Sequence, residues 1–102
     1  MLSDDDRELL RLAAIACGEL RGEWVGNDAY FDGVLTRWNP LTDDGDAMRL
    51  AVKLRLAVRN SEVRASVMSD VGGASERHNG DDCAATRRAI VRAAAEIGKE
   101  QR

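Results

Sequence analysis

The segment WNPLTDDGDA at residues 38–47 constrains the fold more than any other part of the chain. Proline has no N–H to donate to a sheet and restricts the residue before it, so Asn39-Pro40 should end any strand that precedes it. Asp43, Asp44 and Asp46 follow at once, and their side-chain oxygens can accept hydrogen bonds from the free N–H groups of a helix start. The segment therefore predicts a strand, a rigid turn and a capped helix in immediate succession.

The residues around this segment extend the pattern in both directions. Residues 34–38 have a period of two, which suits a half-buried strand, and turn signals divide the longer stretch 23–38. After a helix over about residues 44–54, two strands are expected near residues 55–59 and 62–68, joined at Asn60-Ser61. Apolar residues at helical spacing predict a first helix that begins at Ser3 and a last helix that begins at Asp81 or Asp82.

These elements predict an α+β fold in a single domain over residues 1–102. The expected order is α-β-β-α-β-β-α, with an antiparallel sheet that carries helices on one face. Residues 69–80 are polar, hold three glycines and show no period, so we expect a mobile loop there. The open face and two edges of such a sheet favour a homodimer or a higher homo-oligomer.

Composition narrows the range of functions. The chain is 44% hydrophobic and 32% charged, and its net charge of −3 argues against direct binding of nucleic acid as the main activity. The sequence has neither an apolar run of about 18 residues, which would suit a membrane span, nor a basic signal-peptide start. We therefore expect a cytoplasmic protein without a membrane partner. Cys17 and Cys83 are expected to be free, buried thiols, because a single disulfide is unusual in a reducing cytosol.

Aspartates form three clusters, at residues 4–6, 43–46 and 81–82. Hard cations bind several carboxylates, so each cluster raises the possibility of a metal site. Every cluster also lies where a helix is expected to begin, and capping together with the helix dipole explains them without a ligand. The spacing over residues 43–46 does not match a calcium loop. We therefore expect no metal ion.

Candidates for nucleophilic catalysis are Cys83 and the lone histidine, His78. A helix N-terminus can lower the pKa of a thiol, but Asp81 and Asp82 would oppose that effect. His78 is expected in an exposed position in the loop. With no paired carboxylates to identify either, the sequence predicts a protein that is not an enzyme and has no catalytic residues.

Arginines occupy the outward positions of the expected strands. If the alternating apolar residues face the helices, the opposite face presents four guanidinium groups, which can bind phosphates bidentately. Trp38, Asn39 and Tyr30 could add stacking and hydrogen bonds beside them, although a tryptophan is more often in the core. The four arginines are Arg37, Arg55, Arg59 and Arg64.

The same arginines are compatible with two roles that need no ligand. The face could be a self-association surface, or the arginines could pair with Glu62 and Glu23 across the strands. Cross-strand pairing is the most ordinary of the three roles.

Two segments, WNPLTDDGDAMRLAVKLRL and DDCAATRRAIVRAAAEIG, resemble a set of small phage and prophage proteins of proteobacteria, most of which have no assigned function. More distantly, the layout is similar to the phage NinX-like family, in which an Asn-Pro turn precedes an acidic-alanine helix start, two strands and a C-terminal helix. The resemblance covers most of the chain after Val34 and transfers no catalytic residue. The matching residues are Trp38, Asn39, Pro40, Asp46, Ala47 and, more loosely, Thr86, Arg87 and Ala89.

The resemblance implies a phage accessory protein in the host bacterial cytoplasm that counteracts bacterial immunity. The first hypothesis is a homo-oligomer that sequesters a nucleotide-derived immune signal. The arginines would hold its phosphate, Trp38 or Tyr30 its base, and residues 69–80 would close as a lid. One alternative is a protein–protein inhibitor of a host defence complex, similar to anti-CRISPR proteins, whose aspartates mimic phosphates. A regulatory or assembly helper is a second alternative. No cofactor is expected.

Overall fold

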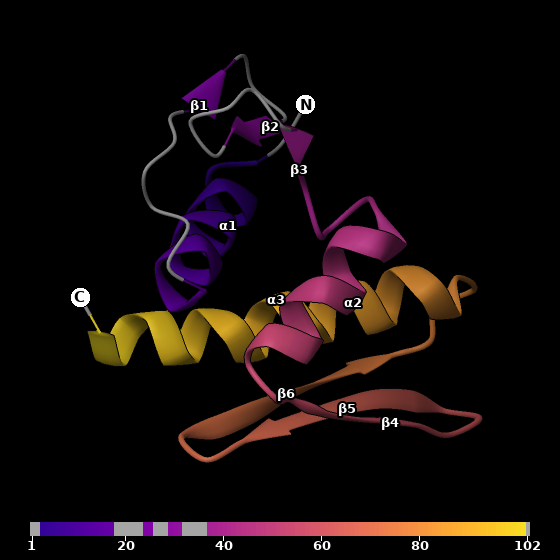
Figure 1. The fold of residues 1–102 in the computed structure, drawn as a ribbon. Helices are drawn as coiled ribbons and strands as arrows, with labels where there is room; N and C mark the ends of the chain where they lie inside the picture. The colour runs from indigo at the N-terminus through magenta and orange to yellow at the C-terminus, as the bar shows by residue number, and fades with distance from the viewer. Residues whose placement is uncertain (1–2, 18–23, 26–28, 32–36, 102) are drawn as a thin grey trace.

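The computed structural model describes residues 3–17, 24–25, 29–31 and 37–101 (Figure 1). This part of the chain forms three helices and two three-stranded antiparallel sheets. The helices are α1 (Asp4–Ala16), α2 (Asp44–Lys53) and α3 (Asp82–Gln101). The smaller sheet contains β1 (Trp24–Val25), β2 (Ala29–Phe31) and β3 (Arg37–Trp38), and the larger contains β4 (Ala57–Asn60), β5 (Arg64–Ser69) and β6 (Gly72–Arg77).

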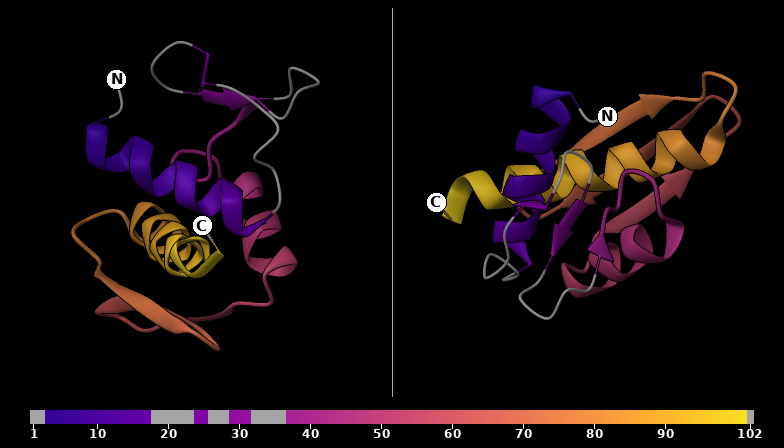
Figure 2. Two further views of the ribbon diagram at one scale, coloured as in Figure 1. Left: turned by 90° about the vertical axis from the view of Figure 1, so that its left-hand side faces the viewer. Right: turned by 90° about the horizontal axis from the view of Figure 1, so that it is seen from above.

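The helices lie on one face of the larger sheet (Figures 1 and 2). The long helix α3 packs directly on β5 and β6, α1 crosses α3 on the side away from the sheet, and α2 lies beside α3. The smaller sheet is on the far side of the helices from the larger one. The predicted α+β domain with helices on one face of an antiparallel sheet is confirmed.

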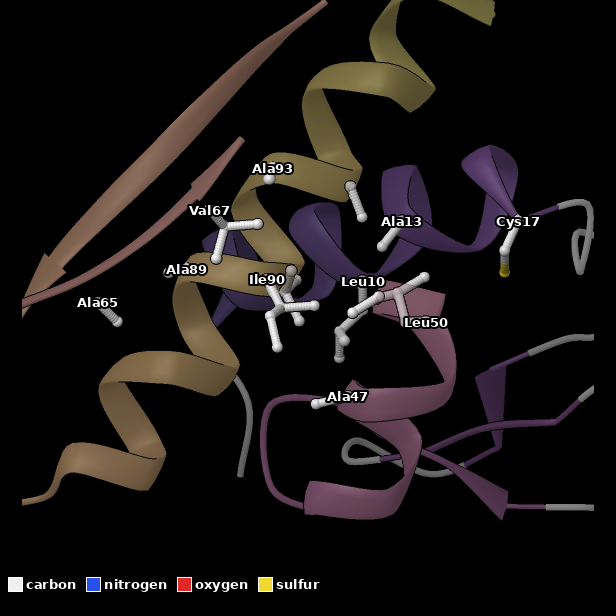
Figure 3. Close-up of a cluster of buried hydrophobic side chains, with 13 residues drawn as sticks. Leu10, Ala13, Cys17, Ala47, Leu50, Ala65, Val67, Ala89, Ile90 and Ala93 are labelled. Carbon is white, nitrogen blue, oxygen red and sulfur yellow. The ribbon is translucent and has the colours of Figure 1, made fainter. Parts of the chain in front are cut away.

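The core lies where α3 meets its neighbours (Figure 3). Leu10 of α1, Leu50 of α2, Val67 of β5 and Ile90 of α3 are all buried there. The rest of the cluster consists mainly of alanines, whose small side chains allow close approach of the helices. Burial of this apolar surface is the main favourable contribution to folding.

The turn at Asn39-Pro40 is fixed from both sides. The Asn39 N–H donates to Asp46 Oδ2 at 2.8 Å, and Asn39 Oδ1 accepts from the Leu41 N–H at 3.0 Å. Asp43 caps α2, as expected, by accepting from the Asp46 N–H at 2.8 Å. From α3, Arg87 donates to the Leu41 carbonyl at 2.9 Å. The WNPLTDDGDA segment is therefore a structural junction between β3, α2 and α3.

Helix α2 ends in a Schellman motif. The Leu56 N–H donates to the Ala51 carbonyl at 2.9 Å, and the Arg55 N–H donates to the Val52 carbonyl at 3.2 Å. Arg55 takes the left-handed position of the motif, with φ of 56°. The expected strand over residues 55–59 therefore starts only at Ala57 and extends to Asn60.

The prediction of a mobile loop over residues 69–80 is wrong. Gly72–Arg77 form β6, which pairs along its whole length with β5. A tight turn joins the two strands, in which Ser69 Oγ donates to the Gly72 carbonyl at 2.8 Å and Gly72 adopts φ of 148°. This adds a strand after the two expected near residues 55–68, and with three strands over residues 24–38 the order becomes α-β-β-β-α-β-β-β-α. Among the described residues, no helix is long and apolar enough to span a bilayer.

Candidate functional site

The register of the larger sheet determines which side chains face away from the helices. Ala65 and Val67 of β5 are buried against α3, so their neighbours Arg64, Ser66 and Met68 must point to the other side. Strand pairing then assigns the rest of this outer surface, since Cα partners share a face. The surface, called the arginine face below, comprises Ala57, Arg59, Arg64, Ser66, Met68, Gly73, Ser75 and Arg77.

The arginine face is not covered by any described element (Figures 1 and 2). A shallow groove of about 620 Å³ runs over it, lined by residues of β4, β5 and the turn between them. Arg59 and Arg64 contribute to the lining, together with Ser61 and Ser66. Hydroxyl groups and guanidinium groups therefore lie side by side along the groove.

Three guanidinium groups on this face have no acidic partner among the described residues. Arg64 and Arg77 are cross-strand neighbours, and Arg59 lies on the adjacent strand. None of the three forms an ion pair with a carboxylate in the described part of the chain. Within the described part of the chain, the Arg64 guanidinium group makes only a long contact of 3.5 Å with Ser75 Oγ. The expected pairing of Arg59 or Arg64 with Glu62 is therefore wrong, and the face carries a concentrated positive charge.

The remaining expected site residues do not join this face. Arg55 lies in the turn after α2, and the prediction that it points outward from a strand is wrong because the Schellman motif delays the start of β4. Asn39 is buried and bonded within its turn, and Trp38 packs against the core cluster from β3. Arg37 belongs to β3 and Tyr30 to β2, in the smaller sheet, and their side chains lie outside the described residues, as does Glu23.

A second hollow lies on the inner side of the larger sheet. Its volume is about 340 Å³, and it is bounded by α2, the first turns of α3, the end of β4 and the residue that follows β6. That residue is His78, whose side chain is only 7% exposed. The expectation of a solvent-exposed loop histidine is wrong, because the pairing of β6 and a 2.9 Å hydrogen bond from the His78 N–H to the Val63 carbonyl hold it in place.

Cys83 lies at this pocket and is exposed, whereas Cys17 is buried at the end of α1. The prediction of two buried thiols is therefore confirmed for Cys17 and wrong for Cys83.

The aspartate clusters have structural roles. Asp81 Oδ1 accepts from the Ala84 N–H at 2.9 Å at the start of α3, and Asp6 pairs with Arg88 at 2.7 Å. Asp44 pairs with Arg87 at 2.6 Å, and Asp46 with Arg49 at 2.7 Å. Within the described ranges, His, Cys, Asp and Glu side chains do not gather in threes that could hold a metal ion.

Sequence reasoning missed Arg77 and Ser75, and it singled out His78 but placed it in an exposed loop. The segment GGASER at residues 72–77 lacks the β-branched and aromatic residues that mark strands. Its one signal was the alternation of Ala74 and Glu76 with Gly73, Ser75 and Arg77, which matches the observed alternation of burial.

No protein-family model, curated protein or solved structure matches this chain. The chemistry of the two regions therefore rests on their own geometry.

Proposed function

We propose that this protein is a non-enzymatic binding protein that takes up a phosphorylated, nucleotide-like small molecule on the arginine face. The observation that carries the proposal concerns Arg59, Arg64 and Arg77, whose guanidinium groups form no ion pair with any described residue and lie on a sheet face that no described element covers. Guanidinium groups match the geometry of phosphate oxygens, and charge-assisted hydrogen bonds are among the strongest in proteins. A bound phosphate would also relieve the repulsion between Arg64 and Arg77.

The serines beside the arginines support the same ligand chemistry. Ser66 Oγ and Ser75 Oγ lie 3.5 Å apart, between the arginines of the three strands. Each hydroxyl can donate to a phosphate oxygen. Residues 72–77, which were expected to be part of a lid, form β6 instead, so the groove is open to solvent. We therefore expect the affinity for a phosphorylated ligand to depend strongly on salt concentration.

The biological role that we propose follows from the resemblance to small phage proteins. A phage accessory protein that captures a nucleotide-derived immune signal would protect the phage without catalysis, in the host bacterial cytoplasm. The open edges of β4 and β6 favour a homo-oligomer. Sedimentation equilibrium at tens of micromolar tests this part, and a monomer would contradict it.

Calorimetric titration with cyclic nucleotides and ADP-ribose derivatives tests the binding proposal. We expect heat of binding and a rise in melting temperature with at least one of them, because a ligand at about 100 times its Kd stabilises the native state by about 2.7 kcal/mol. Arg59→Ala/Arg64→Ala should abolish both effects. Arg55→Ala is the matched control, since it removes an exposed arginine from outside the face. If none of these compounds changes the melting temperature, the proposal fails.

The alternative of a protein–protein inhibitor that mimics phosphates has less support. Three of its candidate carboxylates, Asp6, Asp43 and Asp44, are held in ion pairs with Arg88, Arg49 and Arg87. Such pairing reduces the negative charge that a mimic would present. Recovery of a host defence protein in pull-downs from infected cells would favour this alternative.

A further inference from the structure

The arginine face has two ends of different chemistry. Its residues form three cross-strand rows, because strand partners lie opposite each other on one face. From the first row to the third, the members are Arg64 and Arg77, then Arg59, Ser66 and Ser75, and then Ala57, Met68 and Gly73. The first two rows carry all the charged and hydroxyl side chains of the face, and the third row is apolar.

The groove of about 620 Å³ crosses all three rows. Arg64 and Arg59 line its charged end, and Ala57 and Met68 line its apolar end. Adjacent rows are two residues apart along a strand, which is a distance of about 7 Å. A ligand that lies along the groove with its phosphate at Arg59 and Arg64 would therefore place another group on the apolar row, about 7 Å beyond Arg59.

The guanidinium group of Arg64 extends toward the middle of the groove. Its Nη1 lies 3.5 Å from Ser75 Oγ, and Ser75 belongs to the same row as Arg59. Arg64 therefore brings its charge from the first row to the second, next to the apolar row. This direction favours a phosphate at the second row, with the rest of the ligand over the third.

Met68 forms most of the surface of the apolar row. A Cβ on Gly73 would lie 2.7 Å from Met68 Sδ, so the thioether occupies the space that a side chain at position 73 would fill. Met68 is nevertheless 56% exposed, which leaves much of its side chain open to a ligand. Sulfur–aromatic contacts are favourable, and methionine is common on surfaces that bind varied ligands. Met68 thus offers a platform for a ring on a face that has no aromatic side chain of its own.

The side chains of the apolar row can contact a ring but cannot identify it. Alanine and glycine carry no side-chain donor or acceptor, and the methionine sulfur is only a weak acceptor. Every nucleobase has a flat face, so contact of this kind tolerates any base. In a nucleotide, a sugar separates the phosphate from such a ring, which matches a charged row and an apolar row about 7 Å apart.

We propose that the nucleobase of the ligand lies on Met68 at the apolar end of the groove, while Arg59 and Arg64 hold its phosphate. The site then accepts the common bases without strong preference. This inference rests on the proposed function, since it places the second part of the same nucleotide. Met68 is a binding residue in this assignment.

The methyl group of Met68 is a direct probe of the base. The chain has three methionines, so ¹³C labelling of their methyl groups gives few NMR signals, and Met68→Leu identifies the signal of Met68. The ring current of a base over Met68 would shift this signal, whereas ribose 5-phosphate has no ring current and should leave it nearly unchanged. Met48 is the internal control, because it is 59% exposed but lies on α2, outside the groove.

Affinities test the same assignment. We expect ribose 5-phosphate to bind about twofold to tenfold more weakly than the nucleoside 5′-monophosphates, which is the range that a sulfur–aromatic contact contributes. The four common bases should differ by less than about tenfold, because a hydrogen bond that identifies one base contributes about that factor. Met68→Ala should remove the advantage of the nucleotides over ribose 5-phosphate, and Met68→Leu should retain part of it.

The outcomes distinguish the inference from the proposed function. Nucleotide binding that Arg59→Ala/Arg64→Ala abolishes, but that leaves the Met68 methyl signal unchanged or prefers one base by more than about tenfold, would overturn the inference and leave the proposed function standing. Nucleotides that shift the Met68 signal equally in the wild type and in Arg59→Ala/Arg64→Ala would support a ring site on Met68 and overturn the proposed function. Absence of binding by every nucleotide, including the cyclic ones, would overturn both.

Discussion

Gly98 of α3 lies against the backbone of Leu12 of α1, so closely that a Cβ on Gly98 would lie 2.0 Å from the Leu12 carbonyl oxygen. The absence of a side chain at this position lets α1 cross α3. We predict that Gly98→Ala lowers the free energy of unfolding by about 3 kcal/mol, at the upper end of the cost of overpacking, because rigid backbone must move. Urea denaturation monitored by circular dichroism measures this.

Gly45→Ala is the matched control for Gly98→Ala. Gly45 is also in a helix, but a Cβ there would meet only the ends of the Arg49 and Asp43 side chains at 3.2 Å, which can shift. Alanine is about 1 kcal/mol better than glycine in a helix, so we expect stability within about 1 kcal/mol of the wild-type value. Equal destabilisation by the two substitutions would contradict the role assigned to the Gly98–Leu12 contact.

Arg55 occupies a backbone conformation that favours glycine. Its φ of 56° places it in the left-handed region, which costs a residue with a Cβ roughly 1 kcal/mol or more. Arg55→Gly should therefore raise the melting temperature by several degrees, whereas Arg55→Ala should leave it nearly unchanged. Calorimetry of the two variants checks this, and a lower melting temperature for Arg55→Gly would show that the Arg55 side chain contributes more than its backbone costs.

Asp46 holds the Asn39-Pro40 turn onto α2. Asp46 is 9% exposed, and its carboxylate accepts hydrogen bonds from the Asn39 N–H and from the Arg49 guanidinium group. Asp46→Ala would remove the carboxylate that accepts from the buried Asn39 N–H, and we expect a loss of about 2 to 3 kcal/mol. Asp46→Asn retains a side-chain oxygen that can accept from Asn39, so it should lose less. Denaturant titration of both variants tests the order.

The cross-strand pair Arg64–Arg77 should have a measurable cost for stability. Opposite charges on paired strands contribute roughly 0.2 to 1 kcal/mol, and like charges oppose pairing. We predict that Arg77→Glu stabilises the protein by about that amount and at the same time weakens phosphate binding. Ser75→Thr, on the same face without a change in charge, is the control. A loss of stability in Arg77→Glu at low salt would contradict the repulsion.

The two cysteines should differ in reactivity. Cys83 is exposed and Cys17 is buried, with its thiol donating to the Ala14 carbonyl at 3.6 Å. One thiol per chain should therefore react rapidly with Ellman's reagent in the native state and both in denaturant. Cys83→Ser should abolish the rapid reaction, and Cys17→Ser should preserve it. Rapid reaction of both thiols in native protein would contradict the burial of Cys17.

Local sequence determined the elements with strong local signals. Ser3 caps α1 through the Asp6 N–H at 3.1 Å, and Asp43 and Asp81 cap α2 and α3, as their positions before apolar periodic segments predicted. The predictions that a strand ends just before Asn39-Pro40 and that β5 alternates between buried and exposed residues were also correct. These features depend on contacts a few residues apart, which can be read from spacing.

The tertiary structure alone decided β6, the arginine face and the environment of His78. Glycine, alanine and serine have little preference for a strand, and β6 exists because β5 pairs with it and because α3 covers its inner side, where Arg92 binds Glu76 and donates to the Ser75 carbonyl at 3.2 Å. That pairing brings Arg77 beside Arg64 and places His78 under α3.

The sequence by itself determined where helices begin and which strand residues face the core, because those depend on local hydrogen bonds and periodicity. Which charged side chains share a face, and which polar groups are buried, depended on long-range strand pairing, whose stability comes from packing between segments far apart in the chain.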